Sequence, residues 1–269
     1  MKVSPVAIAT VTAAAMAWMP GVAPTPWRLE TVERHVPSWV QPADCVFPDV
    51  VPAPEEVPAH ELVGQLERAL ACEYYDPEHR ATLRLATLAQ SALELGEPRA
   101  AIAVWAMGQD MTRGDLFSQW VGLDIQRRAV EQLAGDLPDE WVPAVRELAA
   151  RQPPPGLAPW ADHERHAMSR DWDQLAWLAR AHRWLWVAQT EQVARELAPV
   201  LRGPRAGREA RVDAILGDTE TGRGWGPLAL ATHRGRRAVW TRGSGRLVRE
   251  IVRNDIAVCD GAAALIRGR

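Results

Sequence analysis

The chain has 269 residues, of which 47% are hydrophobic and 24% are charged, and its formal net charge is −3. This composition supports one sizeable core with a small appendage and excludes intrinsic disorder over the whole length. Of the 31 basic residues, Lys2 is the only lysine and the rest are arginine. A Schiff base, a pyridoxal-phosphate anchor and a P-loop all need a lysine amine, so we expect none of them and no cofactor.

Residues 1–23 have the layout of a secretory signal peptide. Lys2 precedes an apolar run from Val6 to Met19, and the small-x-small triplets at 15–17 and 21–23 are candidate cleavage sites. An uncleaved anchor and a plain apolar helix are the alternatives, because the run is short and rich in alanine and threonine for a spanning segment. We expect an exported chain that is periplasmic, or membrane-anchored and facing the periplasm.

Residues 24–58 form an acidic, proline-rich segment. Proline lacks a backbone donor and disfavours helix, so we predict an extended linker or a strap lying on the body. In an oxidising compartment Cys45 can pair with Cys72 and tie this segment to the first helix. Three unpaired thiols are the alternative. Cys259 lies in an apolar stretch and is predicted to be a small buried residue.

Residues 59–202 repeat apolar side chains at every third or fourth position, which predicts a domain of helix hairpins. Asp76 and Asp115 are predicted N-caps, Pro98 lies in a first turn, and Gly96 is placed to end a helix. The predicted helices cover residues 58–73, 76–95, 97–113, 115–136, 138–152 and 171–202.

The stretch LAQSALELGEPRAAIAVWAMGQDM resembles one tetratricopeptide-type helix pair. One helix ends at Leu95 and Gly96, a two-residue turn follows, and the small Ala101 lets the next helix approach closely. The resemblance covers residues 80–115, a single unit, with no second copy at a fixed period. It implies helix-hairpin packing and a groove for a partner. Candidate anchors are Trp105, Met107, Met111, Phe117 and Trp120, with core packing as the alternative for each.

The stretch DHERH contains Asp162, His163 and His166 at spacings that place metal ligands on one face of a helix. A metal-dependent hydrolase is therefore one alternative function. The histidines are three apart, whereas the zinc-protease motif HExxH places them four apart. The simpler interpretation is an exposed first turn of a helix, where acidic side chains are favourable.

Residues 203–269 form an arginine-rich segment. Between residues 202 and 253 there are 12 arginines against 5 acids, whereas residues 23–80 have 4 arginines against 11 acids. The excess favours either polyanion binding or docking of the acidic strap. A β-hairpin is predicted within residues 227–242, followed by a helix that breaks at Gly261. The candidate basic patch consists of Arg234, Arg236, Arg237, Arg242 and Arg246.

The sequence therefore predicts a mostly α fold of stacked antiparallel helix hairpins, with a proline-rich N-terminal strap and a small basic C-terminal segment. The predicted function is a non-enzymatic scaffold or adaptor that binds another protein of the cell envelope. We expect no nucleic-acid partner for an exported chain, and membrane contact only through an uncleaved N-terminus.

Overall fold

The computed structural model of the chain consists of two compact units. One unit comprises Glu30–Pro155 and Glu250–Arg269, and the other comprises Met1–Leu29 and Gly156–Arg249. Within them, the structure describes residues 32–33, 36–40, 57–71, 74–75, 79–135, 137–156, 177–217 and 244–268.

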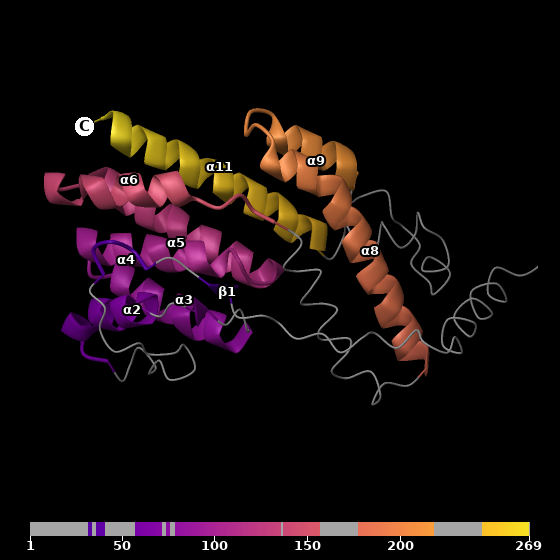
Figure 1. The fold of residues 1–269 in the computed structure, drawn as a ribbon, viewed down its shortest axis with the longest axis horizontal. Helices are drawn as coiled ribbons and strands as arrows, with labels where there is room; N and C mark the ends of the chain where they lie inside the picture. Colours follow the sequence, from indigo (N-terminus) through magenta and orange to yellow (C-terminus); the bar gives the residue numbers. More distant parts are fainter. Residues whose placement is uncertain are drawn as a thin grey trace, which may run out of the picture. The chain divides into compact units, whose positions relative to one another are not determined.

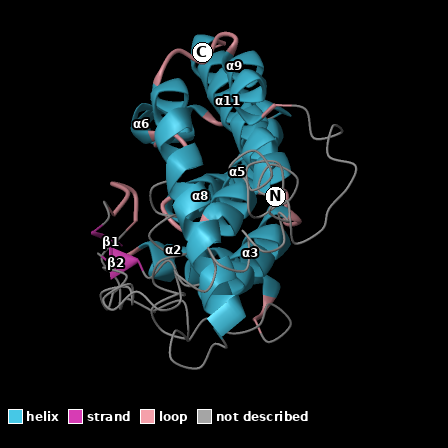
Figure 2. Ribbon diagram, turned by 90° about the vertical axis from the view of Figure 1, so that its right-hand side faces the viewer, coloured by secondary structure: helices cyan, strands magenta, loops and turns pink. Residues whose placement is uncertain are grey.

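The predicted mostly α fold, with helices packed against one another, is confirmed for the part of the chain that the structure describes (Figures 1 and 2). In the first unit, α4 contacts α2, α3, α5 and α6. A short antiparallel bridge pairs β1 (Val32–Glu33) with β2 (Tyr74–Tyr75). The helices of this unit are η3 (Ala59–Glu61), α2 (Leu62–Leu70), α3 (His79–Leu93), α4 (Pro98–Met111), α5 (Leu116–Gly135), η4 (Asp139–Trp141), α6 (Val142–Arg151) and most of α11 (Arg246–Arg267).

Three of the predicted helix-end signals act as expected. Gly96 has a φ of 72° and its N–H donates to the carbonyl of Leu93, which ends α3. Pro98 occupies the first turn of α4. The Asp115 carboxylate accepts a hydrogen bond of 2.7 Å from the Ser118 N–H in the first turn of α5. Asp76 lies outside the described residues.

The predicted break at Gly261 is wrong, because α11 continues through this residue to Arg267. A Cβ atom added to Gly261 would lie only 2.5 Å from Cγ1 of Val130 on α5. The glycine therefore allows two helices to pack closely and does not end one of them.

The central helix of the first unit is α4, in which every residue from Ala100 to Met111 is buried. Its backbone touches that of α5 where two glycines face each other. A Cβ atom added to Gly108 would lie 2.6 Å from the carbonyl oxygen of Gly122, and one added to Gly122 would lie 2.6 Å from that of Gly108. Only glycine permits so short a distance between the two helices.

A buried amide lies at the same crossing. Gln126 on α5 is fully buried, and neither its amide nitrogen nor its amide oxygen has a hydrogen-bond partner. Its Cγ atom faces Gly108. Elsewhere on α5, the hydroxyl of Ser118 shares a buried hydrogen bond of 2.8 Å with the hydroxyl of Thr82 on α3. The α4–α5 crossing thus contains an unsatisfied amide, whereas the polar pair between α3 and α5 is satisfied.

In the second unit, α8 (Trp177–Arg202) packs against α9 (Arg208–Leu216). The predicted apolar stripe is confirmed at Val193, Leu197 and Leu201, all of which are buried. The predicted hairpin within residues 227–242 lies outside the described residues. In the part of the chain that the structure describes, none of the helices has the length and apolar character needed to cross a bilayer.

We expect Gly108→Ala and Gly122→Ala each to lower the free energy of unfolding by about 1–3 kcal/mol, because the new methyl group meets a backbone carbonyl that cannot move by itself. Gly64→Ala on α2 is the matched control. An added Cβ meets nothing within 4 Å there, so the exchange should stabilise by roughly 0.5–1 kcal/mol. Chemical denaturation measures all three, and equal effects would contradict the close crossing.

We expect Gln126→Met to raise the free energy of unfolding by about 1–3 kcal/mol, because methionine has a similar shape and removes two buried groups without partners. Denaturant midpoints of the variant and the parent measure the change. A loss of stability instead would show that the amide makes favourable interactions in solution.

Candidate functional site

A short piece of the proline-rich segment, residues 36–40, docks against the helices of the first unit. The backbone N–H of Ser38 donates to Oε1 of Glu147 on α6 at 3.2 Å, and the Ser38 hydroxyl donates to the other carboxylate oxygen. Arg151 holds the same carboxylate through an ion pair of 2.8 Å. A turn closed by Val40 N–H and the carbonyl of Pro37, at 3.0 Å, shapes the docked segment (residues 36–40).

Apolar side chains bury the rest of the docked segment. Pro37 is buried, Val40 is 6% exposed and belongs to the hydrophobic core, and Val36 and Trp39 pack against that core. The indole N–H of Trp39 is buried and has no hydrogen-bond partner. Pro37 lines one pocket together with Leu70 of α2, Ala106 of α4, and Glu147 and Leu148 of α6, and the surface that these four residues form beside Pro37 is termed the docking groove.

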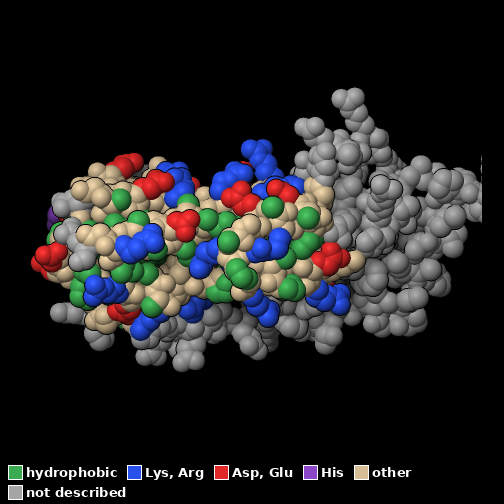
Figure 3. All heavy atoms as spheres, turned by 90° about the horizontal axis from the view of Figure 1, so that it is seen from above, with side chains coloured by type: hydrophobic (Ala, Val, Ile, Leu, Met, Phe, Trp, Pro, Cys, Tyr) green, Lys and Arg blue, Asp and Glu red, His purple; other side chains and the backbone are tan. Residues whose placement is uncertain are grey.

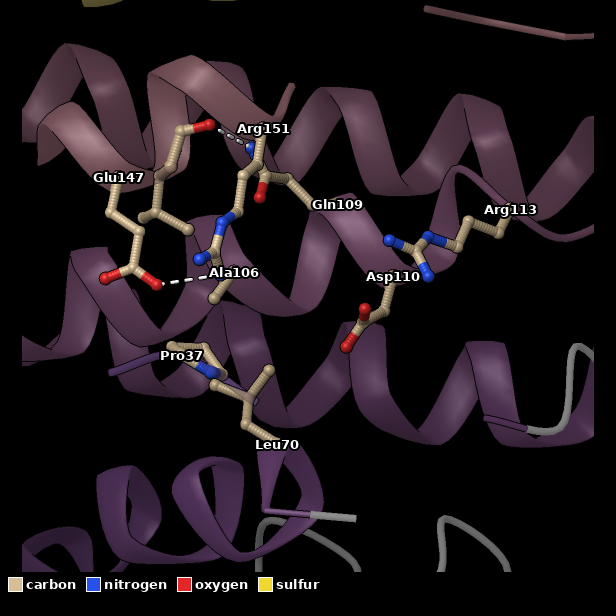
Figure 4. A pocket seen from close by; sticks show the side chains of 9 residues that line it. Pro37, Leu70, Ala106, Gln109, Asp110, Arg113, Glu147 and Arg151 are labelled. Carbon is tan, nitrogen blue, oxygen red and sulfur yellow. Dashed lines mark hydrogen bonds and ion pairs between the residues drawn. The ribbon is translucent and has the colours of Figure 1, made fainter. Parts of the chain in front are cut away.

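A small pocket of about 30 Å³ opens beside Pro37 (Figure 4). Asp110 is 7% exposed, and in Figure 4 the guanidinium of Arg113 extends toward it while its own carboxylate points away from Arg113. The Gln109 amide is fixed by donating to the carbonyl of Leu148 at 2.7 Å and to Oε1 of Gln152 at 2.8 Å. A volume of this size holds about two water molecules, so this pocket fits a small polar group and not a metabolite. Its lining consists of Pro37, Leu70, Ala106, Gln109, Asp110, Arg113, Glu147, Leu148 and Arg151.

The five predicted partner anchors do not lie together on one surface. Trp105, Met107 and Met111 are completely buried within α4, so a partner cannot reach them without opening the bundle. The reason is that α4 is apolar without interruption from Ala100 to Gly108 and that α2, α3, α5 and α6 contact it. The indole N–H of Trp105 points inward and donates to Oε1 of Gln152 at 3.4 Å.

The remaining two anchors, Phe117 and Trp120, are half-buried on α5. Their ring centroids lie 5.7 Å apart with an interplanar angle of 54°, a tilted aromatic pair. Sequence reasoning missed Leu83 on α3, which is 47% exposed. In the sequence, only the position of this leucine outside the apolar stripe of α3 indicates that it is exposed.

Several arginines of the second unit and the start of α11 hold backbone carbonyls of their own unit. Arg208 is 3% exposed and donates to the carbonyl of Gly203 at 2.7 Å. Arg211 donates to the carbonyl of Ala206 at 2.9 Å. Arg249 pairs with Asp213 at 2.6 Å and donates to the carbonyl of Gly217 at 2.8 Å. Part of the local arginine excess therefore satisfies carbonyls in turns and helix ends.

Only one member of the predicted basic patch lies in the described part of the chain, namely Arg246, which is exposed. On the face shown in Figure 3, positive and negative side chains are scattered among hydrophobic ones over the described surface. Arg234, Arg236, Arg237 and Arg242 lie outside the described residues. The metal candidates Asp162, His163 and His166, and the proposed Cys45–Cys72 pair, lie outside them too.

Within the described residues, no group of three histidine, cysteine, aspartate or glutamate side chains is placed to hold a metal ion. Cys259, predicted to be buried, is half-buried, and its sulfur lies 3.9 Å from Oδ1 of Asp255 one turn earlier on α11.

Surface ion pairs join neighbouring helices without creating a reactive group. Arg99 on α4 binds Glu67 on α2 through two contacts of 2.8 and 2.6 Å. The hydrogen bond to Glu67 raises the pKa of Arg99, and a hydrogen bond to Asp124 likewise raises the pKa of Arg127. Both guanidinium groups stay charged throughout the working range of pH, and exposed pairs of this kind contribute about 1 kcal/mol or less.

Because Trp105 is wholly buried and Trp120 is half-buried, the two tryptophans should differ sharply in their effect on stability. We expect Trp105→Ala to lower the free energy of unfolding by about 3–5 kcal/mol, and Trp120→Ala by roughly 1 kcal/mol or less. Thermal or denaturant unfolding of the two variants measures this difference. A large loss in Trp120→Ala would place that side chain in the core.

The described geometry thus offers two surfaces for binding, the docking groove with its pocket and the tilted pair Phe117/Trp120. Within the described residues, neither surface brings together a nucleophile, a general base or metal ligands, which are the groups that catalysis needs. The resemblance of residues 80–115 to a tetratricopeptide unit stays a prediction. No protein-family model, curated protein or solved structure matches the chain.

Proposed function

We propose that the chain is an exported, non-enzymatic scaffold or adaptor that binds another protein of the cell envelope. Phe117 and Trp120 on α5 form part of the contact. The layout of residues 1–23 supports the export, and the helix-hairpin body supports the role as a scaffold.

The observation that carries the proposal is the position of the tilted aromatic pair. Its rings stay half-exposed on a helix whose other side is buried against α4. Large aromatic side chains bury much apolar area with few rotatable bonds, and they dominate the binding energy of protein interfaces. Helix α5 is held rigidly because its backbone touches that of α4, so little ordering is needed when a partner binds.

Affinity capture from the native envelope tests the proposal, with the wild-type chain and the variants Phe117→Ala and Trp120→Ala as baits. We expect wild-type bait to recover a defined protein and each variant to recover it at least tenfold less, because a central aromatic anchor contributes about 2 kcal/mol or more. Quantitative mass spectrometry of the captured proteins provides the measurement.

Arg128→Ala is the matched control, since it removes a long, exposed side chain from the same helix. It should capture the partner as the wild type does. Equal recovery by all four baits would remove the aromatic pair from the interface, and recovery of no specific protein by the wild type would contradict the adaptor function itself.

A further inference from the structure

The docked segment shows what kind of peptide segment the surface of the first unit accommodates. A proline packs beside Leu70 and Ala106, the next residue gives its backbone N–H and hydroxyl to Glu147, and an aromatic side chain packs against the core. Glu147 is oriented for this by Arg151 at 2.8 Å. Recognition through a backbone N–H and a hydroxyl fits any segment with proline followed by serine or threonine.

The docked segment is an imperfect ligand for this groove in two respects. The indole N–H of Trp39 is buried and has no acceptor, which carries the full desolvation penalty of that donor. The pocket of about 30 Å³ beside Pro37 also keeps room next to Gln109 and Asp110 for a further polar group. We expect a segment that corrects either defect to bind the groove better than residues 36–40 do.

We propose that the docking groove is a binding site for a segment of the partner protein, and that residues 36–40 are its intramolecular competitor. The inference rests on the adaptor function proposed above. The partner segment has proline, then serine or threonine, then an aromatic or aliphatic residue without an N–H donor, with a small polar group next to the proline. Because a tethered segment competes at an effective concentration of about millimolar, the partner gains access when it fits better.

The test uses the purified full chain and three fluorescent peptides. The first is RHVPSWVQP, which copies residues 34–42. In the second, the tryptophan is replaced by phenylalanine, and in the third, the serine is replaced by aspartate. The protein variant Ser38→Asp releases the internal segment, since it places a carboxylate against Glu147 while leaving the groove unchanged. Gln90→Glu, which adds the same charge at an exposed position of α3, is the control.

We expect the first peptide to bind Ser38→Asp at least tenfold more tightly than it binds the wild type or Gln90→Glu. The phenylalanine peptide should bind about tenfold more tightly again, because it buries no unpaired donor. The aspartate peptide should not bind. Equal affinity of the first peptide for Ser38→Asp and the wild type, or no affinity for either, would overturn the proposal.

Hydrogen exchange of the wild-type chain gives a second measurement that needs no variant. The amides of Ser38 and Val40 should exchange through a local opening, faster than the amides of α4. Exchange of all of them at one common rate would show that the segment is released only when the unit unfolds, which overturns the proposal.

Two outcomes separate this proposal from the adaptor function. If the peptides do not bind but envelope capture through Phe117 and Trp120 succeeds, the groove proposal is wrong and the adaptor function is unaffected. Light scattering of the wild-type chain tests whether a second copy of the chain occupies the groove instead. A dimer that Ser38→Asp dissociates would assign the groove to that second copy and overturn its assignment to a different protein.

Discussion

The contact between the backbones of Gly108 and Gly122 is the constraint on which the first unit depends. Each glycine faces the carbonyl oxygen of the other, so the backbones of α4 and α5 touch at this point. Helix α5 also reaches α3, to which it is joined by the buried Thr82–Ser118 hydrogen bond. Together α2, α3, α5 and α6 cover α4 from Ala100 to Met111.

The buried glutamines Gln109, Gln119 and Gln126 differ in whether their amides form hydrogen bonds. Gln109 donates to the carbonyl of Leu148, and Gln119 donates to the carbonyl of Gly114 at 3.0 Å, so each amide stabilises a connection between elements. Gln126 lies between the crossing helices, where the neighbouring backbone groups already bond within their own helices. Its amide reduces stability while the first two contribute to it.

Apolar spacing was sufficient to predict the helices between residues 59 and 202, and Gly96, Pro98 and Asp115 marked helix ends because such signals act locally. Helix α9 (Arg208–Leu216) was not predicted. The prediction at Gly261 was wrong because a glycine can either end a helix or admit a neighbouring one, and only the position of Val130 decides between the two. The uninterrupted apolar run from Ala100 to Gly108 was a usable signal for burial of Trp105, yet spacing alone does not say which helices cover it. The Ser38–Glu147 contact joins residues 109 positions apart, and no local pattern announces such a pair.

The two candidate binding surfaces are physically separable although both are supported by α4. The docking groove depends on Ala106 of α4 and on Glu147 and Leu148 of α6, whereas the aromatic pair belongs to the first two turns of α5. A change at the Gly108–Gly122 crossing shifts α5 relative to α4 and therefore disturbs both surfaces together. Changes at Ser38 or Trp120 touch only the outer layer of one surface, so their effects on binding should add independently. Coupling between them would mean that a partner bridges the groove and the aromatic pair across the helices that separate them.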